Sequence, residues 1–147
     1  MRILIVEDEP LLADGLSRSL KQAGYAVDCL DDGQAADTLL LSEQYDCVIL
    51  DPPSFARGNQ GSFSTAKDLR ALHELALDVV APDGVLATSI NSANVSRAKF
   101  EAELLSAAKA KGRALEVLEE ISQPDTFPSR LGDVEGRYLK GWILRVG

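Results

Sequence analysis

The order of apolar and polar positions along the chain alternates between strand-like and helix-like segments. A β-branched and leucine run opens the chain at Arg2 to Val6, and leucines then recur at helical spacing from Leu11 to Leu20 until Gly24. A second strand is predicted at residues 25–30, a helix after Gly33, and a third strand at 46–50. This first third therefore predicts a parallel β-α-β-α-β unit with right-handed crossovers.

The alternation continues after the third strand. A polar, glycine-bearing loop at 52–61 precedes a helix from about Ser64, whose predicted inward residues are Leu69, Leu72, Leu75, Ala76 and Val79. A turn at Pro82-Asp83-Gly84 leads into a strand at 85–89, and a helix follows from the cap residue Ser96 to Lys111, closed by Gly112. Two further strands are predicted at 115–121 and 138–146.

These elements predict an α/β fold built as a three-layer α/β/α sandwich. Because no helical segment separates the last two strands, the sixth strand should run antiparallel. We expect a mostly parallel six-stranded sheet in the order 2-1-3-4-6-5, with strand 6 antiparallel. A chain of 147 residues, 46% hydrophobic and 26% charged, fits a single domain over residues 1–147.

Some site classes and locations are excluded by composition. No run approaches the roughly 18 apolar residues that a membrane span needs, and the N-terminus lacks a signal-peptide pattern, so we expect a cytoplasmic protein without membrane contact. Cys29 and Cys47 lie in predicted strands and are expected to be buried and unpaired. His73 is the only histidine, which argues against a histidine triad or a zinc site.

The net charge of −8 is distributed unevenly. Residues 1–51 hold three basic and eleven acidic side chains, whereas residues 52–147 hold twelve of each. All the excess negative charge therefore lies in the first part of the chain, a composition break that suggests two origins. An acidic chain is also a poor general binder of nucleic acid, and no nucleic-acid partner is expected.

Residues 1–51 resemble the first half of a response-regulator receiver domain, which has a flavodoxin-like fold. The resemblance rests on the opening Met1 to Pro10, Gly24-Tyr25, Asp32-Gly33, and the strand that ends at Asp51. In that family the acidic pair after strand one and the aspartate after strand three bind magnesium, and the aspartate accepts a phosphoryl group. The resemblance implies these roles for Glu7, Asp8 and Asp51, and clustered carboxylates do suit a hard divalent cation.

Two further receiver positions are not clearly filled. Thr88 or Ser89 could supply the hydroxyl that the family needs after strand four. The lysine expected after strand five is missing, because Ile121-Ser122-Gln123-Pro124 stands there. If the last strand lies beside strand four, Arg137 or Lys140 could come near the place of the lost lysine.

Residues 45–147 resemble the back half of a class I S-adenosylmethionine-dependent methyltransferase of the ribosomal-RNA cytosine type. The carrying motifs are Asp51-Pro52-Pro53-Ser54-Phe55-Ala56-Arg57, residues 63–68, residues 84–89 and residues 138–142. The resemblance places Asp51, Pro52, Pro53, Ser54 and Phe55 beside the methyl donor and target base. The donor-binding half is replaced, because Glu7-Asp8-Glu9-Pro10 has no glycine and would repel the donor's carboxylate. Many RNA cytosine enzymes carry a cysteine where this chain has Asn91.

We therefore interpret the chain as a laboratory chimera with a receiver-like half (1–51) and a methyltransferase-like half (52–147), made to test the recombination of fold fragments. It is expected not to be an enzyme and to have no complete active site. No cofactor is required; Mg²⁺ is the ion that the acidic residues suit, and S-adenosylmethionine is not expected. No partner is expected apart from a second copy through exposed apolar surface. The alternatives are a phosphoacceptor at Asp51 and an RNA methyltransferase fragment.

Overall fold

A computed structural model describes residues 1–30, 43–52, 55–58, 61–124, 126 and 138–147. Its elements, in chain order, are β1 (Arg2–Glu7), α1 (Pro10–Gln22), β2 (Ala26–Leu30), β3 (Tyr45–Asp51), β4 (Phe55–Gly58), β5 (Gly61–Ser64), α2 (Thr65–Val79), β6 (Val80–Asn91), α3 (Arg97–Lys111), β7 (Leu115–Ser122) and β8 (Leu139–Val146). The helix predicted after Gly33 lies outside the described residues.

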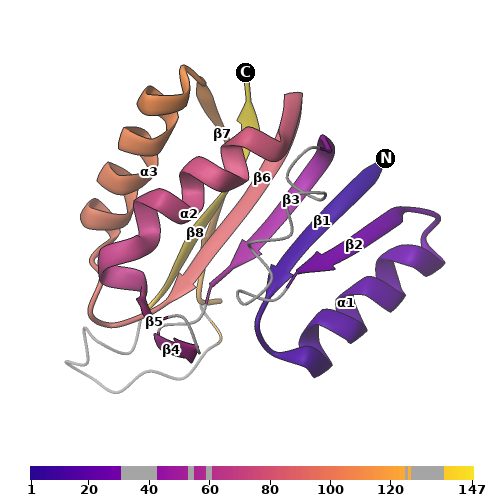
Figure 1. The fold of residues 1–147 in the computed structure, drawn as a ribbon, viewed down its shortest axis with the longest axis horizontal. Helices are drawn as coiled ribbons and strands as arrows, with labels where there is room; N and C mark the ends of the chain where they lie inside the picture. The colour runs from indigo at the N-terminus through magenta and orange to yellow at the C-terminus, as the bar shows by residue number, and fades with distance from the viewer. Residues whose placement is uncertain (31–42, 53–54, 59–60, 125, 127–137) are drawn as a thin grey trace.

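Six strands form one sheet in the order β2-β1-β3-β6-β8-β7 (Figure 1). β1 pairs in parallel with β2 and β3, β3 pairs in parallel with β6, and β8 runs antiparallel to both β6 and β7. This arrangement confirms the predicted α/β fold, strand order and antiparallel last strand.

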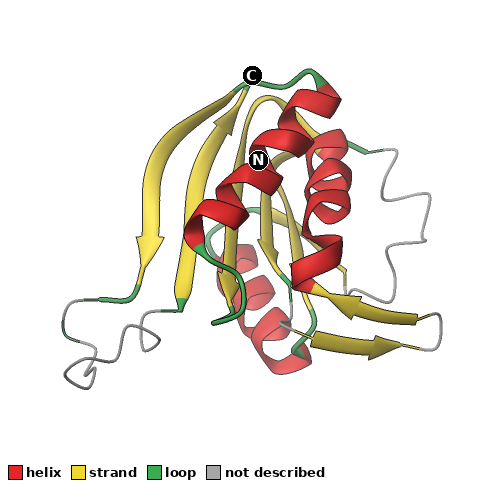
Figure 2. Ribbon diagram, turned by 90° about the vertical axis from the view of Figure 1, so that its left-hand side faces the viewer, coloured by secondary structure: helices red, strands yellow, loops and turns green. Residues whose placement is uncertain are grey.

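Two apolar clusters place helices on opposite faces of the sheet. Ile3, Ile5 and Val27 pack with Leu16 and Leu20 of α1 on one face. The alternate strand positions pack on the other face with α2 and α3, in a larger cluster that includes Leu4, Val48, Leu50, Leu69, Leu86, Phe100 and Leu144. Figure 2 shows α2 and α3 side by side along that face. The period-two alternation of the strands thus divides the core into two layers.

The helix caps follow the sequence signals. The Ser96 side chain accepts a hydrogen bond from the Lys99 main-chain N–H, and Gly112 ends α3 in the left-handed conformation at φ 63°. Pro10 occupies the first turn of α1, and the Glu9 carboxylate accepts from the Leu11 main-chain N–H. Both predicted boundaries of α3 are therefore confirmed.

Several local predictions are wrong. The loop predicted at 52–61 contains β4 and part of the hairpin that it forms with β5. The turn predicted at Pro82-Asp83-Gly84 lies within β6, where Asp83 has φ 61° and the pairing with β3 shifts register. Leu75 is 39% exposed rather than inward-facing. Cys29 is exposed on the edge strand β2, although Cys47 is half-buried and both are free.

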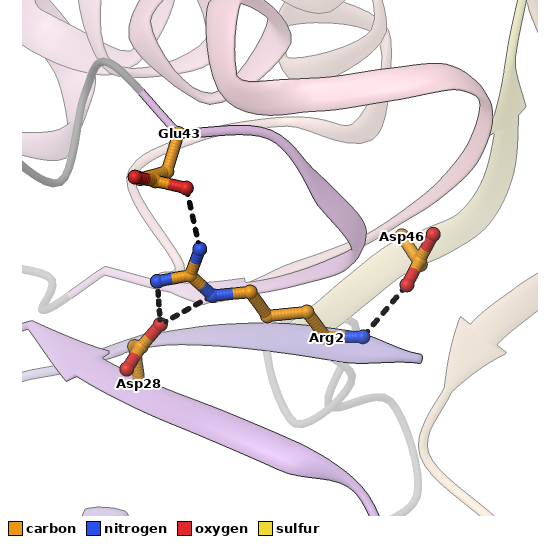
Figure 3. Close-up of polar contacts among 4 residues, drawn as sticks. All are labelled: Arg2, Asp28, Glu43 and Asp46. Carbon is orange, nitrogen blue, oxygen red and sulfur yellow. Dashed lines mark hydrogen bonds and ion pairs between the residues drawn. The ribbon is translucent and has the colours of Figure 1, made fainter.

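The amino-terminal ends of β1, β2 and β3 are joined by Arg2 (Figure 3). Its guanidinium donates to Asp28 at 2.9 Å and to Glu43 at 2.6 Å, and its main-chain N–H donates to Asp46 at 2.7 Å. The side chain and main chain of Arg2 together connect β1 with β2 and with the start of β3. The guanidinium charge offsets part of the acidic excess of this half. The carboxyl-terminal Gly147 lies at the same edge of the sheet, where it exchanges two main-chain hydrogen bonds with Ala114 (Figure 1).

Among the described residues, no helix combines the length and the hydropathy that a membrane crossing requires.

Candidate functional site

Three polar side chains stand in a row at the carboxyl edge of the sheet, on the face that α1 covers further along β1. Glu7 ends β1 and pairs in register with Asp51 at the end of β3. Leu50 pairs with Thr88, which places Asp51 opposite Ser89 of β6. Because neighbouring strands lie about 4.8 Å apart, Glu7, Asp51 and Ser89 are adjacent across three strands. We call these three residues the rim row.

Hydrogen bonds fix the rim row. The Ser89 hydroxyl donates to Asp51 Oδ1 at 2.8 Å, and the Glu9 main-chain N–H donates to Glu7 Oε1 at 3.0 Å. Glu7 is only 7% exposed, and Asp51 is half-buried. The acidic turn after β1 therefore folds back over one carboxylate while β6 supplies the donor for the other.

Burial and neighbouring negative charges disfavour the charged forms of both carboxyls. Burial raises the pKa of Glu7, and the charges of Asp51 and Asp8 raise it further, while the hydrogen bond from Glu9 opposes the rise. Burial also raises the pKa of Asp51, with a smaller contribution from Asp8, while the Ser89 hydrogen bond opposes it. A bound cation would relieve the repulsion at both groups.

Glu7→Gln is expected to raise the melting temperature at pH 7. A carboxyl whose pKa is higher in the folded state stabilises the fold when protonated and loses that contribution as the pH rises through its folded value, so ionised Glu7 is unfavourable at pH 7. The gain should shrink as the pH falls toward 4.5, the ordinary value. Thermal melts of wild type and variant at several pH values measure it.

Glu101→Gln, which removes an exposed carboxylate on α3, is the matched control and should change the melting temperature little at any pH. A Glu7→Gln variant that melts at or below the wild-type temperature at pH 7 would contradict the electrostatic account of the rim row.

The structure does not gather the predicted metal ligands into a three-carboxylate site. Among the residues that the structure describes, no group of three or more His, Cys, Asp and Glu side chains could hold a metal ion. Asp8 is exposed and influences the rim row through its charge. Glu7 and Asp51 remain as a pair, and one or two carboxylates with several waters is the usual protein environment of Mg²⁺.

The two candidate hydroxyls point to opposite faces of the sheet. Ser89 reaches Asp51, whereas Thr88 is 1% exposed and lies 2.8 Å from His73 Nε2 in the core. His73 Nδ1 lies 2.7 Å from the Leu69 carbonyl oxygen, which can only accept, so Nδ1 carries the proton and the Thr88 hydroxyl donates to Nε2. The sequence left this choice open, and the register decides it. His73, four residues from Leu69 and Leu77, could have been recognised as inward-facing from its spacing.

Lys140 does not replace the missing lysine at Asp51. β8 does lie beside β6, but Lys140 pairs with Ile90 on the core side, is buried, and donates to the Ser92 and Val95 carbonyl oxygens at 2.6 Å each. Its amine therefore holds the connection between β6 and α3. This prediction is wrong because the alternation along β8 turns residue 140 away from the rim row. Arg137 lies outside the described residues.

The methyltransferase-type residues are only partly described. Pro52 is buried directly after Asp51, and Phe55 begins β4, while Pro53 and Ser54 lie outside the described residues. Asn91 ends β6 with an exposed side chain. The described part of this segment therefore keeps Asp51 and Pro52 at the same edge as the rim row.

In comparisons with known proteins, different parts of the chain match different families. The family model of the response regulator receiver domain matches residues 3–52. Transcriptional regulatory protein TctD of Salmonella typhimurium is 53% identical over 51 residues, which are 35% of this chain and 23% of that protein. Ribosomal RNA large subunit methyltransferase I of Aeromonas salmonicida is 33% identical over 104 residues, which are 71% of this chain and 26% of that protein. The chain thus spans about a quarter of the length of the curated relatives that it matches.

Solved structures confirm the fold over nearly the whole chain. The crystal structure of SMU.776 complexed with SAH has a TM-score of 0.75 at 21% identity, covering 98% of this chain and 44% of that one. The SAM-dependent methyltransferase from Agrobacterium tumefaciens has a TM-score of 0.59 at 14% identity, covering 99% of this chain and 55% of that one. At these identities the likeness concerns the fold alone.

The expectation that the chain is not an enzyme is contradicted by relatives named ribosomal RNA methyltransferases, which match more than two thirds of the chain, although the chain spans only about a quarter of their length. The expected resemblance to two families is confirmed. The chain joins a receiver-like first part, matched at residues 3–52, to a part similar to the ribosomal-RNA large subunit methyltransferases, within one α/β sheet.

Proposed function

We propose that the chain is a chimera of two α/β families, assembled in the laboratory to recombine fold fragments. The support is that β3, which ends at Asp51, pairs with β1 of the receiver-like part and with β6 of the other part in one continuous sheet. Unfolding in urea should then be a single transition. Trp142 fluorescence, which reports on the methyltransferase-like part, should coincide with far-UV circular dichroism, and two separate midpoints would contradict the proposal.

We further propose that the chemistry of this chimera is that of a receiver: Asp51 accepts a phosphoryl group with Mg²⁺ held by Glu7 and Asp51. The observation that carries this is the rim row, in which two carboxylates with raised pKa values stand next to a hydroxyl on the adjacent strand. A bound cation would offset the negative charge of this pair of carboxylates. A carboxylate beside a bound cation is a competent nucleophile.

The proposed reaction uses a small acyl phosphate as donor. An Asp51 carboxylate oxygen attacks the phosphorus, a new O–P bond forms, and the O–P bond to the acyl group breaks, so that the carboxylate of the donor leaves with the electron pair. The Ser89 hydroxyl, 2.8 Å from Asp51 Oδ1, can then donate to a phosphoryl oxygen. Bound Mg²⁺ would offset the charge that develops on those oxygens.

Mass spectrometry after incubation with acetyl phosphate and Mg²⁺ tests this reaction. Wild type should gain one phosphoryl group, and the gain should be lost with EDTA and in Asp51→Asn. Asp83→Asn is the matched control, because Asp83 is an exposed aspartate at φ 61°, a conformation that asparagine also adopts. Equal labelling of Asp51→Asn, or no labelling of wild type, would overturn the proposal.

Methyl-donor binding is the second candidate, supported by the similarity of most of the chain to methyltransferases. The described turn at Glu7 to Pro10 fits the donor poorly, since it has no glycine and holds a buried carboxylate where the donor's carboxylate would approach. Calorimetric titrations separate the two candidates. Saturable heat with S-adenosylmethionine that persists in EDTA would favour this candidate, whereas heat with Mg²⁺ that Asp51→Asn abolishes favours the first.

A further inference from the structure

Among the described residues, none of the three helices packs on one face of the sheet where β6, β8 and β7 lie. The antiparallel registers place on this face Val85, Ala87 and Ser89 of β6, Gly141, Ile143 and Arg145 of β8, and Glu116, Glu119 and Ile121 of β7. We call this set the open face. It is the same face of the sheet that α1 covers over β1 and β2. The open face adjoins the rim row through Ser89.

Exposure alternates along β6 from Gly84 onward and along β8 except at the buried Gly141, whereas most of β7 is exposed on both faces. Leu86, Thr88 and Ile90 of β6 are buried, as are the β8 residues Trp142, Leu144 and Val146 on the same side. On the open face, Val85, Ala87 and Ile143 are only half-buried, and Arg145 is exposed. β1 differs, because Ile3, Leu4 and Ile5 are all buried and so both of its faces are covered.

The strands carry the sequence of a sheet that is covered on both faces. Val85, Ala87, Ile143 and Ile121 are apolar although they stand on the open side, and near-continuous apolar strands are typical of sheets buried on both faces. In the described part of the chain, the apolar cluster around α1 ends at β3 and includes no residue of β6, β7 or β8. Within the described part of the chain, a half-buried apolar stripe therefore lies beside one that α1 covers.

We propose that a second copy of this chain covers the open face, sheet against sheet, in a twofold-symmetric dimer. Charge selects this occupant. The whole net charge of −8 belongs to residues 1–51, whereas the open face lies within residues 52–147, which hold twelve basic and twelve acidic side chains. The face itself therefore carries little net charge, so two copies can meet here without strong repulsion, and stacked sheets about 10 Å apart would bury the stripe.

The charged residues beside the apolar stripe have opposite signs, so this surface can pair with a second copy of itself. Arg145 forms an ion pair with Glu116 at 3.1 Å, and Glu119 lies beside Ile143 on β7. A twofold axis makes each contact occur twice, so Arg145 of one copy can meet a glutamate of the other across the apolar centre. Like charges would face each other if residue 145 were acidic, which makes this position the sensitive one.

Sedimentation velocity on the full chain tests the dimer. Wild type should sediment as twice 15.8 kDa at about 100 µM and dissociate on dilution to about 0.1 µM. Ile143→Glu, at the centre of the stripe, should be monomeric throughout. Leu105→Glu, which alters a 55% exposed leucine on α3 in the opposite layer, is the matched control and should remain dimeric.

Arg145→Glu decides the outcome if Ile143→Glu fails to fold, because Arg145 is exposed and its loss costs only a surface ion pair. It should weaken dimerisation at least about tenfold while circular dichroism stays unchanged. A wild type that is monomeric at about 100 µM overturns the proposal. So does an Arg145→Glu dimer as tight as wild type, or a dimer that Leu105→Glu disrupts instead.

Discussion

Gly141→Ala is expected to lower the free energy of unfolding by about 3 kcal/mol or more, or to prevent folding altogether. A Cβ atom at this position would overlap the Thr88 main-chain carbonyl oxygen and stand 2.8 Å from Ser89 Cα. Both of those contacts are backbone atoms of β6, so relief requires β8 to move away from its neighbour. Urea unfolding at neutral pH measures the loss.

Gly15→Ala is the matched control for this substitution. Gly15 lies within α1, and an added Cβ would meet no atom within 4 Å, so alanine should stabilise the protein by about 0.5–1 kcal/mol through its higher helix propensity. Opposite signs for the same chemical change would confirm that crowding, and not the extra methyl group, causes the loss. A Gly141→Ala variant that unfolds like wild type would show that β8 does not pair with β6 in this register.

Protein stability is expected to fall by up to about 3 kcal/mol as the pH is lowered from 6.5 to 4, because of His73. Burial lowers the pKa of this fully enclosed imidazole from 6.5 to about 4, and the hydrogen bond to the Leu69 carbonyl only partly opposes that. The unfolded chain therefore binds a proton in this window that the folded protein does not. Protonation would also remove the acceptor at Nε2 that the Thr88 hydroxyl uses.

Unfolding free energies of wild type and His73→Gln, measured between pH 4 and pH 7, isolate this contribution. Glutamine places an amide where the ring was and does not titrate. The unfolding free energy of the variant should therefore depend less on pH than that of wild type, whatever its absolute value. Glu7 and Asp51 act in the opposite direction in the acid range, since their pKa values are raised, and they act equally in both proteins. Parallel pH profiles for the two proteins would refute the role of His73.

Most of the sheet could be predicted from the sequence because its strands are long and apolar and its helices carry clear caps. Ser96 and Gly112 bound α3 as expected, and the lack of a helical sequence pattern between the last two strands correctly predicted their antiparallel pairing. The hairpin of β4 and β5 was not predicted, since short polar strands with glycine at their ends have the composition of a loop. The turn signal Pro82-Asp83-Gly84 lies within β6, where Asp83 has a positive φ.

The candidate site was less predictable than the fold, because its side chains depend on register. Sequence alone placed Asp51 at a strand end but could not tell Ser89 from Thr88, which differ only in the face they occupy. The same alternation of side chains along a strand directs Lys140 into the core and away from Asp51. A register shift of one residue would reverse both outcomes.

The position of Gly147 beside Ala114, at the same sheet edge as Arg2, has a practical consequence for engineering. Affinity tags or fused reporters attached before Met1 or after Gly147 would emerge at the end of the sheet opposite Asp51 and leave the rim row uncovered. Circular permutation is also favoured by this arrangement, with a linker spanning β1 and β8 across the intervening strands β3 and β6 and new ends opened elsewhere.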